Sequence, residues 1–70
     1  MSVEMNIQVN AQPREIPKGC TIADLLAEMR LEPRLVAVEV NKMVGPRAQH
    51  GQHVLHEEDR LEIVTLVGGG

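Results

Sequence analysis

Residues 61–70 read LEIVTLVGGG, a strongly apolar run that passes directly into three glycines. Residues 61–67 form the longest strand-like segment of the chain, and the apolar residues Ile63, Val64, Leu66 and Val67 predict burial on both faces. A strand this apolar is expected at the centre of a sheet. Because glycine carries no side chain, residues 68–70 predict a thin, flexible tail beyond the strand.

Three segments upstream show the two-residue alternation of strands. In residues 1–9 apolar and polar side chains alternate, which predicts a first strand with one buried face. A turn over residues 10–13 should lead into a short edge strand at residues 14–16, since Pro13 lacks the N–H that a central strand needs. Residues 36–40 predict a third strand, and Asn41-Lys42 suits a tight reversal into residues 43–44.

One helix is expected between these strands. Thr21 is a good N-cap, Asp24 can complete a capping box, and Cys20 is placed for a hydrophobic staple with Leu25. Four apolar residues with helical spacing form one stripe that should lie across the sheet: Ile22, Leu25, Leu26 and Met29. Pro33 is expected to stop the helix.

The order of elements predicts an α+β fold, a mixed sheet of four to five strands with one helix packed on one face. Residues 45–51 read as a loop around a short turn, and Leu55 should return to the core. We expect a folded domain over residues 1–67 and a tail over residues 68–70.

Size and composition narrow the range of possible functions. A 70-residue domain is too small for a deep catalytic cleft, so function should lie on a surface or at a terminus. The chain has no aromatic residue and a formal charge of -3, which disfavours nucleic acid as a partner. With one cysteine, no signal-peptide pattern and no segment of membrane-spanning length, we expect a cytoplasmic protein without membrane contact.

The glycines suggest where the chemistry takes place. Gly68 and Gly69 could pass through a narrow tunnel, so that the Gly70 carboxylate reaches ATP held by another protein. The alternative is that these glycines are a frayed end without a role.

Three blocks of the sequence resemble a known family. The run Val36-Ala37-Val38-Glu39-Val40-Asn41, the segment Val44-Gly45-Pro46-Arg47 and the ending from Glu58 to Gly70 are similar to the ThiS family of sulfur carriers. The resemblance implies a ubiquitin-like β-grasp fold, with the first and last strands side by side at the centre of the sheet. The chain departs from the family at two loop positions, since the family often has an apolar or aromatic residue where this chain has His50, and Gly where it has Glu58.

The resemblance also implies a reaction sequence in which the chain is not itself an enzyme. An E1-like enzyme would use ATP to adenylate Gly70, and sulfur from a cysteine desulfurase system would convert the carboxylate to a thiocarboxylate. Thiazole synthase would then take the sulfur for the thiazole ring of thiamine. The chain would bind no cofactor of its own. Leu66 and Val67 are candidates for partner docking.

Several other hypotheses stay open. The chain could be a carrier like the small subunit of molybdopterin synthase, a ubiquitin-like modifier of lysines, or a plain interaction module. His50, His53 and His56 could bind a metal, but we expect no metal site there. Cys20 is expected to pack in the core and not to act as a nucleophile. Acidic residues 57–59 and 62 could steer a basic partner, although such turns are usually just solvated.

Overall fold

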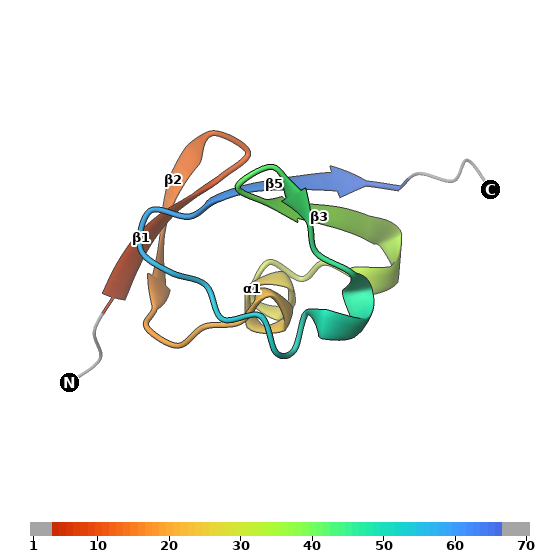
Figure 1. The fold of residues 1–70 in the computed structure, drawn as a ribbon, viewed down its shortest axis with the longest axis horizontal. Coiled ribbons are helices and arrows are strands. Elements are labelled where there is room, and N and C mark those ends of the chain that lie inside the picture. The colour runs from red at the N-terminus through yellow and green to blue at the C-terminus, as the bar shows by residue number, and fades with distance from the viewer. Residues whose placement is uncertain (1–3, 67–70) are drawn as a thin grey trace.

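The computed structural model describes residues 4–66, which form five strands, one α-helix and two short 3-10 turns. The strands are β1 (Glu4–Val9), β2 (Gln12–Pro17), β3 (Val36–Val40), β4 (Met43–Val44) and β5 (Arg60–Thr65). The helix is α1 (Ile22–Glu28), and the turns are η1 (Pro33–Leu35) and η2 (Arg47–Gln49). Figure 1 shows the strands in one layer and α1 beneath them, so the described residues form two layers.

The strand order in the sheet is β2-β1-β5-β3-β4. The central strand β5 is parallel to β1 and antiparallel to β3, and the two hairpin pairs are antiparallel. The α+β fold class, the mixed sheet with one helix on one face, and the neighbouring first and last strands are therefore confirmed.

Alternation along the strands builds the core. Every second residue of β1 and β3 points toward α1 and is buried, while the residues between them face away. The largest fully buried side chains come from strands, helix and loop alike: Ile7, Ile16, Ile22, Leu25, Leu26, Val38, Leu55 and Leu61. The prediction that Leu55 returns to the core is thus confirmed.

The start of α1 follows the predicted capping box. The Thr21 hydroxyl oxygen accepts a hydrogen bond from the Asp24 backbone N–H, and the Asp24 carboxylate accepts one from the Thr21 N–H, each at 3.1 Å. These bonds satisfy backbone donors that a helix start leaves without partners.

The end of α1 was placed too late by the sequence. The helix ends at Glu28 and not near Pro33, because Arg30 adopts a left-handed conformation with φ of 59°. The Leu31 N–H then donates to the Leu26 carbonyl at 2.9 Å, which is the Schellman pattern of helix termination.

Both hairpins turn through two residues with positive φ. Asn10 and Ala11 have φ of 52° and 67°, and Asn41 and Lys42 have φ of 51° and 72°, the geometry of type I′ turns. The reversal at Asn41-Lys42 is confirmed. The first turn is shorter than the expected residues 10–13.

The strand β2 is longer than the predicted residues 14–16. It includes Pro13 and Pro17, which pair with Gln8 and Glu4 of β1. The Gln8 N–H donates to the Asp59 carbonyl on the β5 side, so this residue pair makes no ladder bonds between β1 and β2. Pro13 therefore breaks no hydrogen bond of the sheet. This agrees with the expectation from the sequence that the strand with Pro13 lies at an edge.

The expectation that the last strand is buried on both faces was wrong. Val64 is 58% exposed and Leu66 is 52% exposed, while Ile63 on the α1 side is partly buried. The cause is that α1, the one α-helix in the described part of the chain, covers only one face of the sheet. β5 also ends at Thr65, short of the predicted residue 67, and Val67 lies outside the described residues.

Candidate functional site

The candidate site is the end of β5, where the chain leaves the sheet. The tail residues Gly68, Gly69 and Gly70 and the docking candidate Val67 lie outside the described residues, so their roles stay predictions. Leu66 is the last described residue. Its backbone N–H donates to the Leu35 carbonyl at 2.7 Å, which holds the chain against β3 up to this point.

On its other side β5 is held by β1 and by one side chain. The parallel pairing with β1 covers only Gln8 with Arg60 and Val9 with Leu61. Beyond this pairing the Asn10 side chain takes over, since its Oδ1 accepts from the Ile63 N–H at 2.8 Å and its Nδ2 donates to the Ile63 carbonyl at 3.2 Å. The side-chain amide thus replaces one peptide group of a neighbouring strand.

Sequence reasoning missed the role of Asn10. It assigned this residue to a turn, which is correct, but the hydrogen bonds span 53 positions and depend on how β1 and β5 pair. An asparagine in a turn is common for local reasons. No local signal in the sequence could have identified this contact.

The sheet face opposite α1 carries apolar side chains near the end of β5. Val64 in β5 and Leu66 just beyond it are large, apolar and exposed, and the exposed Val44 of β4 lies in the same cross-strand row as Glu39 and Glu62. Leu66 is therefore accessible to a partner. On the same face Glu39 of β3 stands directly opposite Glu62 of β5, a like-charge pair.

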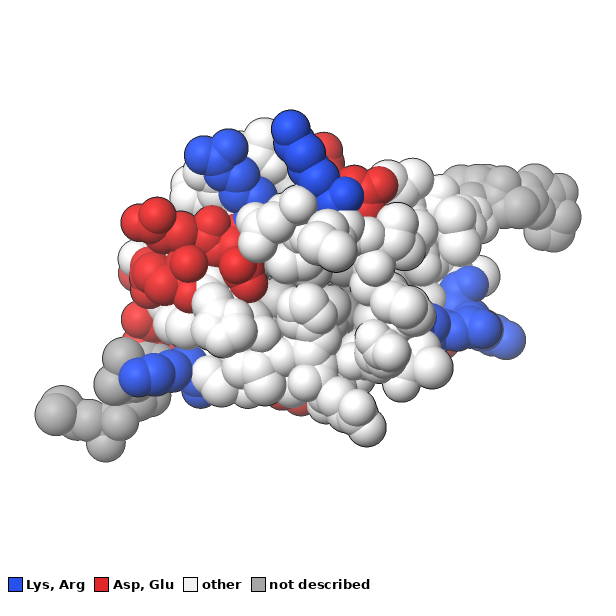
Figure 2. Space-filling model, in the orientation of Figure 1, with Lys and Arg blue, Asp and Glu red and all other residues white. Residues whose placement is uncertain are grey.

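The acidic turn before β5 divides into structural and exposed residues. Asp59 is buried, and its carboxylate accepts from the Asn41 side chain at 3.0 Å and from the His56 N–H at 2.8 Å. Glu57 and Glu58 are exposed. In Figure 2 acidic side chains gather at the left of the view, over the turn that leads into β5.

Glu58 occupies a backbone position that favours glycine. Its φ is 68°, in the left-handed region, and its N–H donates to the Asn6 carbonyl at 2.7 Å. This agrees with the family's usual glycine at this position. Glu58 therefore adopts the left-handed conformation that suits glycine, although the residue itself differs from the family pattern.

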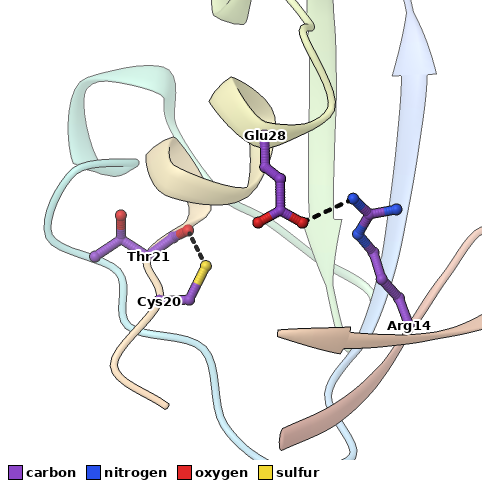
Figure 3. A network of polar contacts seen from close by, with 4 residues as sticks. All are labelled: Arg14, Cys20, Thr21 and Glu28. Atoms are coloured by element: carbon purple, nitrogen blue, oxygen red, sulfur yellow. Dashed lines mark hydrogen bonds and ion pairs between the residues drawn. The ribbon is translucent and has the colours of Figure 1, made fainter. Parts of the chain in front are cut away.

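Cys20 lies in the core next to the start of α1. Figure 3 shows its thiol directed at the Thr21 carbonyl, and the Cys20 sulfur lies 3.4 Å from the Thr21 carbonyl oxygen. Burial raises the pKa of the Cys20 thiol, and the carboxylates of Asp24 and Glu28 raise it further. Since the thiolate is the reactive form, these surroundings favour the packing role that the sequence indicated.

A second polar contact in Figure 3 joins β2 to α1. The Arg14 guanidinium lies 2.9 Å from the Glu28 carboxylate, and both side chains are partly exposed. Such a pair contributes little to stability, on the order of 0–1 kcal/mol. It joins the C-terminal end of the helix to the edge strand.

The three histidines do not converge. His50 is buried with its Nε2 2.8 Å from the Gly45 carbonyl, whereas His53 is partly buried and His56 exposed. Within residues 4–66 no group of three or more His, Cys, Asp or Glu side chains is arranged to hold a metal ion. The helix of the described part is also too short and polar to cross a membrane.

Comparisons with known proteins agree on one family. The ThiS family model matches residues 7–70. The sulfur carrier protein ThiS of Bacillus subtilis is 44% identical over 50 residues, which cover 71% of this chain and 76% of that protein. A solved structure of a thiamine biosynthesis protein (ThiS) from Geobacter metallireducens has a TM-score of 0.81 and 26% identity, and the match covers 94% of this chain and 100% of that chain.

A thiazole synthase is similar as well. The thiazole synthase of Magnetococcus marinus is 41% identical over 66 residues, which make up 94% of this chain. The chain spans only 20% of the length of that protein. Together, the family match over nearly the whole chain, the relative in Bacillus subtilis and the shared fold establish that the chain belongs to the ThiS family.

Proposed function

We propose that the chain is a sulfur carrier whose Gly70 carboxylate is adenylated by an E1-like enzyme and converted to a thiocarboxylate. The thiocarboxylate then donates its sulfur to thiazole formation. The observation that carries this proposal is the family match that continues through the glycines to residue 70. In this role the chain is a co-substrate of other enzymes and binds no cofactor itself, while ATP binds to the activating partner.

The chemistry explains why activation must come first. A carboxylate is a poor electrophile until one oxygen becomes part of a leaving group, and adenylation provides adenylate as that group. Sulfur derived from cysteine then replaces this oxygen and remains on Gly70 as a nucleophile. Because Gly68 and Gly69 have no side chains, a narrow active site can close around the backbone.

The described residues support the delivery of a tail. Backbone bonds at Leu66 and the Asn10 side chain at Ile63 hold β5 until just before the glycines. The tail is therefore attached to the centre of the sheet and not to a loosely held edge strand. Leu66, which is exposed beside it, and Val67 are the residues we assign to partner docking.

Thiazole synthase is the acceptor enzyme we assign. Its support is the similarity between this chain and one fifth of a thiazole synthase, which indicates that the two functions can share one polypeptide. We assign the E1-like enzyme and the cysteine desulfurase system because membership in the ThiS family implies them.

The direct test is the intact mass of the purified chain before and after incubation with ATP, the activating enzyme and a cysteine-derived sulfur source. We expect a gain that matches replacement of one oxygen by sulfur, localised to Gly70 by fragmentation. A variant with one residue added after Gly70 is the control and should show no gain. A folded chain that gains no mass with an enzyme proven active would overturn the carrier role, and an isopeptide remnant on other proteins would indicate a modifier.

A further inference from the structure

The edge of β5 that faces β1 has no strand beside its last part. Pairing with β1 stops at Leu61, and the Asn10 side chain extends it by one step to Ile63. After Asn10 the chain turns back into β2. Figure 1 agrees, since the arrowhead of β5 extends to the right beyond the β1 and β2 pair.

The direction of each backbone group in β5 follows from the hydrogen bonds on its two sides. Toward β3, the Arg60 carbonyl accepts from the Asn41 N–H, and the Leu66 N–H donates to the Leu35 carbonyl. Toward β1, the Leu61 carbonyl accepts from the Asn10 N–H, and Ile63 bonds to the Asn10 side chain. Because these directions alternate along a strand, the N–H and C=O of Thr65 point to the β1 side. None of residues 4–66 pairs with them there.

This part of β5 also lacks the features that usually protect an edge. The strand β2, at one border of the sheet, contains Pro13 and Pro17 together with charged side chains, and β4 at the other border is only two residues long. Residues 63–66, at the end of β5 and just beyond it, contain neither proline nor charge. Proteins normally block such edges because they pair with other chains, so an unblocked edge beside a functional tail indicates a partner strand.

We propose that the β5 edge at Thr65 is a docking site for an extended backbone segment of the sulfur-accepting enzyme, which adds to the sheet as a strand directly beyond Asn10. This inference rests on the proposed function, because it places the partner one residue before Leu66 and in line with the tail. The Asn10 side chain is hydrogen bonded to the Ile63 backbone, so Thr65 is the first open position on this edge. Main-chain bonds would provide affinity that does not depend on the Thr65 side chain.

Hydrogen exchange of the Thr65 amide tests the proposal on the intact chain. The chain is incubated in D₂O alone or with purified thiazole synthase, the exchange is quenched, and the remaining amide protons are measured by NMR. We expect exchange at Thr65 to slow by about tenfold or more in the complex, as for a newly formed backbone hydrogen bond. The Glu15 amide on the outer edge of β2 is the control and should exchange at the same rate in both samples.

Two variants separate the backbone from the side chain. Thr65→Pro removes the edge N–H without touching the β3 ladder, so it should fold and bind thiazole synthase about 3- to 10-fold more weakly. Thr65→Ala keeps the N–H and should bind like the unaltered chain. Equal losses for both variants would overturn the proposal in favour of a side-chain contact. If Thr65→Pro failed to fold, the exchange measurement on the unaltered chain would still decide.

Failure of the docking proposal can be told apart from failure of the proposed carrier function. Binding to thiazole synthase with an unchanged Thr65 exchange rate would overturn the strand-addition proposal and leave the carrier role intact. Sulfur loading at Gly70 without any binding to thiazole synthase would overturn the proposed acceptor and this docking site together. Slow exchange at Thr65 with an unchanged control amide supports the proposal.

Discussion

The two faces of the sheet come from alternating residues of the same strands, yet they differ in composition and burial. On β5, Leu61 faces α1 and is 1% exposed, whereas Val64 on the opposite face is 58% exposed. The face that α1 covers is part of the core. The opposite face combines exposed apolar side chains with the like-charge pair Glu39 and Glu62.

This difference indicates that one face of the sheet stabilises the fold while the other is available for contacts with other proteins. The buried face must supply nearly all the hydrophobic stabilisation, because the one α-helix among residues 4–66 covers one face of the sheet. The open face is free to carry residues chosen for contacts with other proteins. Three predictions test whether stability and binding really divide between the two faces.

The largest effect is expected from a pair of alanine substitutions on β5. Leu61→Ala removes a fully buried side chain and should lower the free energy of unfolding by about 2–5 kcal/mol. Val64→Ala, on the open face of the same strand, should change it by less than about 0.5 kcal/mol. Urea unfolding followed by circular dichroism measures both, since the chain has no aromatic residue for fluorescence. Equal losses would show that the open face also carries stability.

The second prediction concerns binding and uses Leu66. If the open face serves partners, Leu66→Ala should weaken binding to thiazole synthase roughly tenfold and change unfolding by less than about 0.5 kcal/mol. Met43→Ala is a matched control, because Met43 is also exposed and apolar but lies on β4 at the border of the sheet. Isothermal titration calorimetry gives the affinities. A Leu66→Ala variant that loses stability but not affinity would assign Leu66 to packing.

The local features of the fold could be predicted from the sequence because their causes lie close together along the chain. The capping box joins Thr21 to Asp24 three positions away, and Asn41-Lys42 turns through its own backbone. Alternation placed β1 and β3 for the same reason. The topology of the sheet came from the family resemblance and could not be obtained from spacing alone.

The features that sequence reasoning missed depend on distant parts of the chain. An apolar run does not reveal how many layers will cover it, so Val64 was expected inside. Asn10 contacts Ile63 only because β1 and β5 are neighbours in space. Ala11 has positive φ because the hairpin imposes a type I′ turn, a conformation that alanine disfavours by itself. Gly70 lies outside the described residues, so its chemical role stays a prediction.

The smallest effect is expected from the like-charge pair of the open face. Glu39 and Glu62 stand opposite each other on β3 and β5, and like charges in this arrangement are destabilising. Glu62→Lys replaces the repulsion by an attraction and should raise the free energy of unfolding by about 0.2–1 kcal/mol. The gain should shrink as salt screens the charges.

A control separates this local pair from the overall charge of the chain. Glu4→Lys changes the net charge by the same amount, but Glu4 stands opposite Pro17 and has no acidic residue across the strand. Urea unfolding of both variants at two salt concentrations should therefore show the larger gain for Glu62→Lys. Equal gains would mean that Glu39 and Glu62 do not interact in particular. A larger gain for Glu62→Lys would show that the chain retains a repulsive pair on its open face at a cost in stability.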